Sequence, residues 1–599
     1  MLNYFKSQLK HFFFFYSFLG NKVYVLLLLS LLTGFLDGFG LAMFIPLVQV
    51  AGNESLDNSQ VSESLGILKF LVNGITGAGF ELTPAVILSF LFLIFLLKGL
   101  IKYFEGHYKV LVQMFFVKKI RYQMVDDLGN MSYRSFLKLD AGRVQNTLSG
   151  EVYKIISAYV AYFATLQSVV LLSVYLVLAL LANFQFALLV SFGGYLTNFI
   201  YKIIYKRTTV ASINNSNLSH VYQGLLIQAV HHFKYLKATD FFGKYKAKLK
   251  SYVDQIEDEQ KKIGVFNAIL QASREPLVIG IVILVILIQL TVLDSNMAAI
   301  FLSLLFFYRA LNYIMLVQTS WQAFTSNLGG LHVGVELLED FKKGAEKNFG
   351  EKNIDQIRTI QLDNVSFGYD PLNPILKNIN ITIEKNLTYA LVGKSGSGKT
   401  TLTNILAGLI EPSSGGFQIN QTNRDQVEMG SYRERVGYIT QEPVIFNDTI
   451  FNNVSFWSEP NPKNKAKFFN AIKLAHLEEL LESLPEKENT NLGDNGVLIS
   501  GGQKQRISIA RELYKEVDLL IFDEATSALD SETEKAIQNN IESLKGSCNI
   551  ILIAHRLSTV KNADKIVVMN DGFIEGSGEF FELMENNVRF KNMVGLQEF

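Results

Sequence analysis

One glycine-rich run in the second half of the chain constrains the fold more than any other feature. An apolar stretch, residues 389–392, precedes this run, and residues 401–406 then have the pattern of a helix. A strand, a glycine-rich loop and a helix in this order are typical of a P-loop, whose backbone N–H groups close on phosphates. The run therefore predicts an ATP site formed by Gly393, Lys394, Ser395, Gly396, Ser397, Gly398, Lys399, Thr400 and Thr401.

Two side chains of this loop have distinct expected roles. Lys399 is placed to reach the β- and γ-phosphates, and the Thr400 hydroxyl is placed to hold Mg²⁺. We therefore expect ATP and Mg²⁺ as cofactors.

The composition indicates two unlike halves. A chain of 599 residues is too long for a single hydrophobic core. Apolar residues make up 49% of it, including 46 Phe and 25 Tyr, yet 18% of the residues are charged. We interpret this as a membrane domain joined to a soluble domain. The net charge is zero and no basic tail is present, which argues against a nucleic-acid partner. The single cysteine, Cys548, excludes an internal disulfide and a zinc site built from cysteines.

Six apolar segments are each predicted to cross a membrane. Residues 1–22 precede them and fit an amphipathic helix on the inner membrane face. An acidic loop, 52–83, precedes the second segment, and a basic cluster, 118–121, follows it, so both termini are expected in the cytoplasm. Residues 84–130 as one helix would measure about 70 Å, so this span must continue into the cytoplasm. The six segments are 23–50, 84–103, 157–182, 184–204, 276–293 and 297–318.

These patterns predict a multidomain fold. We expect an all-α six-helix transmembrane domain at 1–335, a charged linker at 336–356, and an α/β P-loop ATPase domain with a helical subdomain at 357–599.

The soluble half carries further motifs in a fixed order, and these resemble one family. Residues 499–503 resemble the signature motif of ATP-binding cassette (ABC) proteins, and 519–524 resemble their Walker B strand. Residues 527–530 resemble the D-loop, 554–557 the switch-histidine segment, 438–442 the Q-loop and 365–369 the adenine-stacking segment. Together with the six spans, the chain resembles the exporter branch with one membrane domain and one ATPase domain per polypeptide.

The resemblance implies a role for each matching position. Glu524 is the implied general base, His555 the γ-phosphate contact and Gln441 a sensor of Mg²⁺ and the attacking water. Asp523, Thr400 and Gln441 are the implied metal site. Tyr369 is expected to stack on adenine, and Asp530 belongs to the D-loop at the nucleotide. The signature residues Ser500, Gly501, Gly502 and Gln503 are expected to bind the ATP that another subunit holds.

The signature motif thus implies a dimer, either with a second copy or with a related half-transporter. Residues 493–496 resemble the exporter X-loop, with Asp494 and Asn495 where Glu and Arg are common. Residues 136–143 and 237–245 resemble the two cytoplasmic coupling segments. We expect an integral protein of the bacterial inner membrane with its ATPase domain in the cytoplasm.

The sequence constrains the transported substrate less than it constrains the ATP site. Charges inside spans are costly and tend to face a cavity or a partner. They are Asp37, Lys98, Lys102, Arg274 and Arg309. Either the cations form a wall for an anionic lipid head group, such as a phosphate or pyrophosphate, or Asp37 neutralises Lys98 or Arg309. In the second case, Lys102 and Arg274 extend to the inner membrane interface. The main hypothesis is ATP-driven flipping of a lipid-linked oligosaccharide, glycolipid or other lipid. Export of drugs, hydrophobic toxins or peptides is the alternative. A soluble ABC ATPase would lack the spans, and a slow ATP-gated channel would not need Glu524.

Overall fold

The computed structural model describes residues 2–44, 46, 47, 50, 70–182, 184–291, 297–347, 350–523, 539, 541–554 and 560–595. These residues form two compact units. The helical unit comprises Met1–Met131 and Lys138–Ala345, and the α/β unit comprises Ser132–Leu137 and Glu346–Phe599. This division does not test the domain limits expected from the sequence, which remain predictions.

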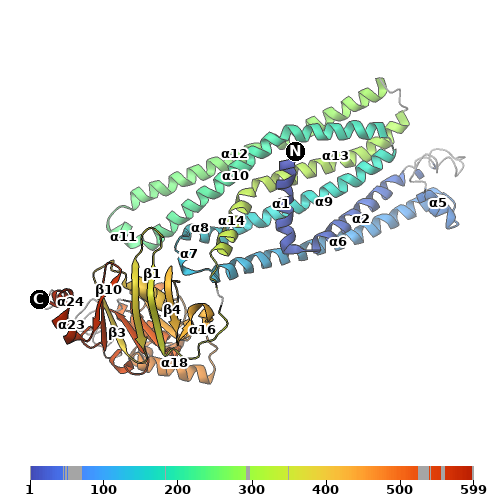
Figure 1. Ribbon diagram of the computed structural model, residues 1–599. Coiled ribbons are helices and arrows are strands. Elements are labelled where there is room, and N and C mark those ends of the chain that lie inside the picture. Colours follow the sequence, from blue (N-terminus) through green and yellow to red (C-terminus); the bar gives the residue numbers. More distant parts are fainter. Residues whose placement is uncertain are drawn as a thin grey trace. The chain divides into compact units, whose positions relative to one another are not determined.

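The helical unit consists of long helices joined by short connections (Figure 1). Its first elements are α1 (Leu2–Leu19), α2 (Lys22–Ala42), α5 (Phe70–Gly77), α6 (Pro84–Gly129), α8 (Ala141–Asn146) and the π-helical turn η2 (Thr147–Glu151). The later elements are α9 (Val152–Ala182), α10 (Phe184–His231), α11 (Phe233–Ala238), α12 (Phe242–Thr291), α13 (Met297–Ser326) and α14 (Leu328–Lys343).

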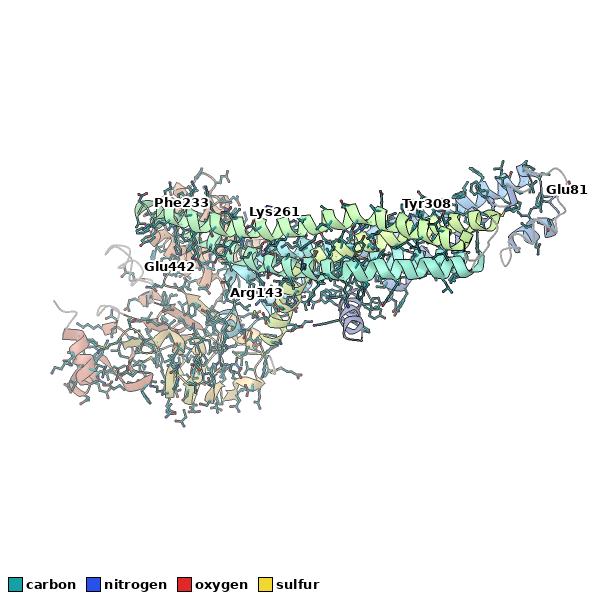
Figure 2. The ribbon with its side chains drawn as sticks, turned by 90° about the horizontal axis from the view of Figure 1, so that it is seen from above. Glu81, Arg143, Phe233, Lys261, Tyr308 and Glu442 are labelled. Carbon is teal, nitrogen blue, oxygen red and sulfur yellow. The ribbon has the colours of Figure 1, made fainter. Side chains whose placement is uncertain are left out.

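The second predicted span is confirmed as one long helix. α6 has 46 residues and begins where the Thr83 side chain accepts a hydrogen bond from the Val86 amide, with Pro84 in the first turn. Among the described residues, four helical stretches are long and apolar enough to cross a membrane. They are Lys22–Ala42, Pro84–Gly129, Ala141–Leu180 and Phe242–Ile288. Glu81, in the loop expected outside, and Phe233, in a connection expected inside, lie at opposite ends of this unit (Figure 2).

Helices distant in sequence pack side by side in this unit. α9 packs along α13, α10 along α12, and α2 along α6. Aromatic residues fix α1 against this bundle, since Phe15 is fully buried with its ring 5.7 Å from that of Phe116. Phe116 in turn stacks on Tyr159 with 4.5 Å between ring centroids.

The predicted coupling segments are not single helices. Residues 136–143 cover the last residue of α7 (Tyr133–Phe136), a break, and the first turn of α8. Residues 237–245 likewise cover the end of α11, a turn at Asp240 with φ +56°, and the start of α12.

The α/β unit contains two sheets. The antiparallel sheet has the order β2-β1-β4-β5, and the larger sheet has the order β10-β9-β3-β8-β7-β6. In the larger sheet all neighbouring strands pair in parallel except β10 with β9. The strands are β1 (Thr359–Phe367), β2 (Leu376–Glu384), β3 (Thr388–Gly393), β4 (Ser414–Ile419), β5 (Thr422–Asn423), β6 (Val436–Ile439), β7 (Leu519–Asp523), β8 (Asn549–Ile553), β9 (Lys565–Asn570) and β10 (Phe573–Gly578).

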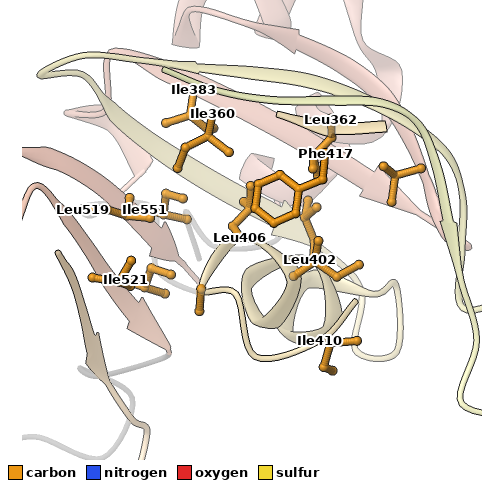
Figure 3. Close-up of a cluster of buried hydrophobic side chains, with 14 of the residues drawn as sticks. Ile360, Leu362, Ile383, Leu402, Leu406, Ile410, Phe417, Leu519, Ile521 and Ile551 are labelled. Carbon is orange, nitrogen blue, oxygen red and sulfur yellow. The ribbon is translucent and has the colours of Figure 1, made fainter. Parts of the chain in front are cut away.

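The helix that follows the P-loop lies between the two sheets. Leu402 and Leu406 of α15 (Lys399–Leu406) pack against Ile360 and Phe417 from one sheet and Ile551 from the other (Figure 3). All five side chains are at most 5% exposed, so burial of apolar area fixes this helix and the loop before it.

The remaining elements of the α/β unit are short helices. They are α7, η3 (Arg424–Gln426), α16 (Met429–Glu434), α17 (Ile450–Ser455), α18 (Pro462–Leu474), α19 (Glu478–Ser483), η4 (Lys487–Asn489), η5 (Asp494–Gly496), α20 (Gly501–Tyr514), α23 (Phe580–Asn586) and α24 (Val588–Gly595). α17, α18 and α20 pack together around Phe451 and Phe468, which form part of a second core. The predicted α/β fold with a helical part is thus confirmed.

Candidate nucleotide-binding site

The predicted motifs converge because they follow neighbouring parallel strands. The P-loop follows β3, Gln441 comes two residues after β6, and Asp523 ends β7. β3 pairs with β8, β8 with β7, and β7 with β6. Parallel strands end at the same edge of a sheet, and ligands of open α/β sheets bind at that edge. The fold therefore places one candidate site at the carboxyl edge of the large sheet.

The P-loop has the backbone that a phosphate cradle requires. Gly396 and Gly398 have φ of +80° and +101°, which L side chains rarely adopt. A Cβ at Gly398 would also lie 2.7 Å from Leu376 Cδ2. The Lys399 ammonium is buried, and it donates to the carbonyls of Gly393 at 2.8 Å and Lys394 at 3.1 Å. The loop thus holds a positive charge on a tightly shaped backbone.

One further polar group of this loop fits an anion. Within the described residues, the Ser397 hydroxyl is buried and has no hydrogen-bond partner. Buried polar groups are almost always satisfied, so an orphaned hydroxyl inside a glycine loop suits a ligand that accepts its proton. The exposed Lys394, Ser395 and Thr400 and the buried Thr401 complete the loop and the first turn of α15.

The groups expected around Mg²⁺ are oxygen donors. Thr400 offers a hydroxyl, Gln441 an amide oxygen and Asp523 a carboxylate, which suits a hard cation that also binds nucleotide phosphates. The Asp523 carboxylate accepts a hydrogen bond of 2.9 Å from the Tyr438 hydroxyl. Burial raises the pKa of Tyr438, and the negative charge of Asp523 raises it further. The donor set fits the ion, because a hydroxyl, an amide oxygen and a carboxylate are all hard oxygen ligands.

The adenine segment is held by a residue from a distant part of the sequence. Arg134, in α7, donates to the carbonyls of Gly368 at 3.1 Å and Tyr369 at 3.3 Å. Its guanidinium also lies 5.3 Å from the ring of Phe367, within cation–π range. Tyr369 is partly buried and meets Phe367 edge to face at 5.1 Å. The pKa of the Tyr369 hydroxyl is raised above its ordinary value, mainly because the side chain is buried.

The signature residues form the start of α20. The Ser500 hydroxyl accepts from the Gln503 amide at 3.3 Å, and the Gln503 side chain accepts from the Ser500 amide at 2.8 Å. This capping box defines the helix start. Ser500 and Gly501 are exposed and Gly502 is buried, so the positive end of the helix dipole faces outward.

Three predicted site residues, Glu524, Asp530 and His555, lie outside the described residues. The roles of all the site residues stay predictions.

The sequence analysis assigned no role to three residues at the site: Tyr438, Arg134 and Asn404, whose Oδ1 lies 3.2 Å from the Tyr438 hydroxyl. Tyr438 lay inside the predicted Q-loop, and the pairing of β6 with β7 would have placed it on the same face as Asp523. No local pattern marks Arg134, because its contact bridges more than two hundred residues.

Several charged residues of the predicted spans have polar partners within the helical unit. Lys98 forms an ion pair with Asp37, which also accepts from the Tyr175 hydroxyl. Lys102 is exposed and lies 3.8 Å from Glu105. Arg274 is buried and donates to the Thr319 hydroxyl.

Glu105, which the sequence analysis did not single out, is also buried in this unit. It accepts from Ser30 at 2.8 Å, Thr33 at 3.0 Å and Gln167 at 3.2 Å. Of the two hypotheses for the charges in the spans, mutual neutralisation describes the contact between Asp37 and Lys98.

Comparisons with known proteins agree with this architecture. The family model described as ABC transporter matches residues 376–527. The heterocyst differentiation ATP-binding protein HepA of Nostoc is 30% identical over 496 residues, which cover 82% of this chain and 80% of that protein. The chain belongs to the ABC transporter family.

Two more comparisons define the type of ABC transporter. An ATP-dependent lipid A-core flippase of Cupriavidus pinatubonensis is 27% identical over 558 residues, covering 90% of this chain and 92% of the flippase. The structure of a bacterial Atm1-family ABC exporter with ATP bound has the same fold, with a TM-score of 0.76, 22% identity and coverage of 97% and 99%. This ABC transporter is therefore an exporter-type half-transporter with fused membrane and ATPase domains, an integral membrane protein that couples ATP hydrolysis to transport.

Proposed function

We propose that two copies of this chain use ATP to flip an amphipathic lipid, such as a lipid-linked oligosaccharide or glycolipid, across the bacterial inner membrane. The observation that carries this proposal is the similarity to a lipid A-core flippase over 90% of the chain, including the helical unit. The ATPase domain lies in the cytoplasm in this proposal.

The proposed chemistry assigns one role to each group. Lys399 and the loop amides bind and orient the β- and γ-phosphates. Glu524 takes the proton of the attacking water, which Gln441 orients, and His555 contacts the γ-phosphate. Thr400, Gln441 and Asp523 would hold Mg²⁺, which neutralises phosphate charge when it is bound.

Dimerisation is supported by the start of α20. Ser500 and Gly501 expose the positive end of a helix dipole, and the capping box of Ser500 with Gln503 satisfies part of it. In the proposed dimer this end meets the γ-phosphate of ATP on the partner's P-loop. If ATP binds the closed dimer more tightly than the open one, this difference would drive the membrane helices from an inward-open to an outward-open state.

The ion pairs of the helical unit limit which cations could bind a lipid head group. Asp37 pairs with Lys98, and Lys102 lies 3.8 Å from Glu105. We therefore propose that an anionic head group contacts Arg309 and draws the exposed Lys102 away from Glu105. Lys102 is 61% exposed along its side chain, and Arg309 is partly buried in α13.

Reconstitution tests this function. Proteoliposomes with the purified protein and a fluorescent glycolipid are expected to move the label between leaflets only with ATP. Lys102→Gln combined with Arg309→Gln should lower lipid-stimulated ATPase activity several-fold while the basal rate persists. ATP-dependent movement of a hydrophobic dye or a peptide, with no lipid movement, would contradict the lipid assignment and support the alternative export function.

A further inference from the structure

The carboxylate at the end of β7 has a neighbour whose role the motifs do not assign. The Tyr438 hydroxyl lies 2.9 Å from Asp523 Oδ2 and 3.2 Å from Asn404 Oδ1. Asn404 belongs to α15, the helix that follows the P-loop, and it is 7% exposed. One phenol therefore bridges the strand of Asp523 and the helix that carries Thr400.

The strand pairing explains why this contact forms. Tyr438 and Ile521 are paired residues of the parallel strands β6 and β7. Side chains alternate along a strand, so Asp523, two residues beyond Ile521, lies on the same face as Tyr438. A tyrosine side chain is long enough to reach such a diagonal neighbour. A phenylalanine would fill the same space without the hydroxyl.

We propose that Tyr438 is a positioning residue for the metal–nucleotide complex: its hydroxyl orients the Asp523 carboxylate towards the ion. This proposal rests on the metal role proposed for Asp523. A phenol is neutral at physiological pH, so it can donate to the carboxylate without adding a competing charge. One Asp523 oxygen is then fixed, and the other is held in a defined direction. Partners of this kind outside the ligands commonly change metal affinity ten- to a hundredfold.

The test measures ion binding without turnover. Full-length protein in detergent is saturated with a non-hydrolysable ATP analogue, and Mn²⁺ binding is followed by electron paramagnetic resonance. Tyr438→Phe should raise the dissociation constant for Mn²⁺ about tenfold. It should leave the affinity for the nucleotide in EDTA unchanged. Raising the Mg²⁺ concentration should restore most of its ATPase activity.

A matched control is available in the same sheet. Tyr389 on β3 is fully buried, whereas Tyr438 is partly buried. The Tyr389 hydroxyl donates to the Thr382 carbonyl at 3.2 Å and accepts from the Glu384 amide at 3.0 Å. Tyr389→Phe therefore removes a bonded phenol away from the site, and it should leave Mn²⁺ affinity unchanged. Melting temperatures of both variants report any general loss of stability.

The outcomes separate the two proposals. If Asp523→Asn weakens Mn²⁺ binding and Tyr438→Phe does not, the positioning role is wrong and the metal site stands. If Asp523→Asn also leaves Mn²⁺ affinity unchanged, the metal role of Asp523 itself is wrong. Equal weakening by Tyr389→Phe would show a structural effect and would overturn the inference.

Discussion

The helical unit and the carboxyl edge of the large sheet use polar groups in opposite ways. In the helical unit, Asp37 pairs with Lys98, and the buried Glu105 accepts three hydrogen bonds from neutral side chains. At the sheet edge, Lys399 donates to the backbone carbonyls of Gly393 and Lys394, and the Ser397 hydroxyl has no partner among the described residues.

This difference shows which polar groups are expected to do chemistry. A buried charge that is fully paired is already stabilised, and it mainly holds helices together. A donor fixed on backbone beside an orphaned hydroxyl is prepared for a ligand that brings its own negative charge. Substitutions at the sheet edge should therefore change the ATPase rate, and substitutions in the helical unit should change the stability of the fold.

The largest effect is expected at the P-loop. Lys399→Ala should lower the ATPase rate by about 10²–10³, because the group that stabilises the transferred phosphoryl is lost. Phosphate release by the purified full-length protein measures this. Lys385→Ala, an exposed lysine in the turn before β3, is the control and should retain the wild-type rate. A similar melting temperature with a lost ATPase rate would confirm the contrast with the helical unit.

A stability effect is expected at the ion pair. Asp37→Asn should lower the free energy of unfolding by about 2–3 kcal/mol, since it leaves Lys98 largely buried without a counter-charge. The double variant Asp37→Asn with Lys98→Met should recover most of this loss. Thermal unfolding in detergent measures both, with Asp126→Asn, exposed on α6, as the control. An unchanged melting temperature together with lost lipid stimulation would instead assign this pair to cargo.

The smallest effect concerns a buried charge of the α/β unit that resembles those of the helical unit. Glu512 on α20 is 8% exposed, and burial raises its pKa, although Lys515 and Arg511 oppose the rise. The folded state therefore holds this proton to higher pH than the unfolded state, so stability is lost as pH rises through the folded pKa.

Glu512→Gln removes that dependence. Its melting temperature should exceed the wild-type value by about 2 °C at pH 8, and by less at pH 5.5. The same difference at both pH values would contradict this assignment.

Much of the fold follows from local patterns. The P-loop run, the apolar spans and the order of the ABC motifs predicted the helical membrane half and the α/β ATPase half of the chain. The long α6 was predicted because no proline interrupts the segment between Pro84 and Asn130.

The sequence predicted fewer of the side-chain partners, because these depend on packing between segments that are distant in the sequence. The sequence offered Lys98 or Arg309 as partners of Asp37, and only the helix packing selects Lys98. It gave no role to Glu105, whose three donors come from α2 and α9. The broken coupling segments, 136–143 and 237–245, likewise depend on turns at positions that no strong breaker marks.

Arg134 gives the α/β unit an unusual dependence on the chain. Residues 132–137 lie in sequence between α6 and α8, yet they fold with residues 346–599. The α/β unit is thus discontinuous, and a fragment cut at Glu346 would lack the Arg134 guanidinium that donates to the carbonyls of Gly368 and Tyr369. Exchange of ATPase domains between related transporters should therefore succeed best when the short inserted segment is exchanged with them.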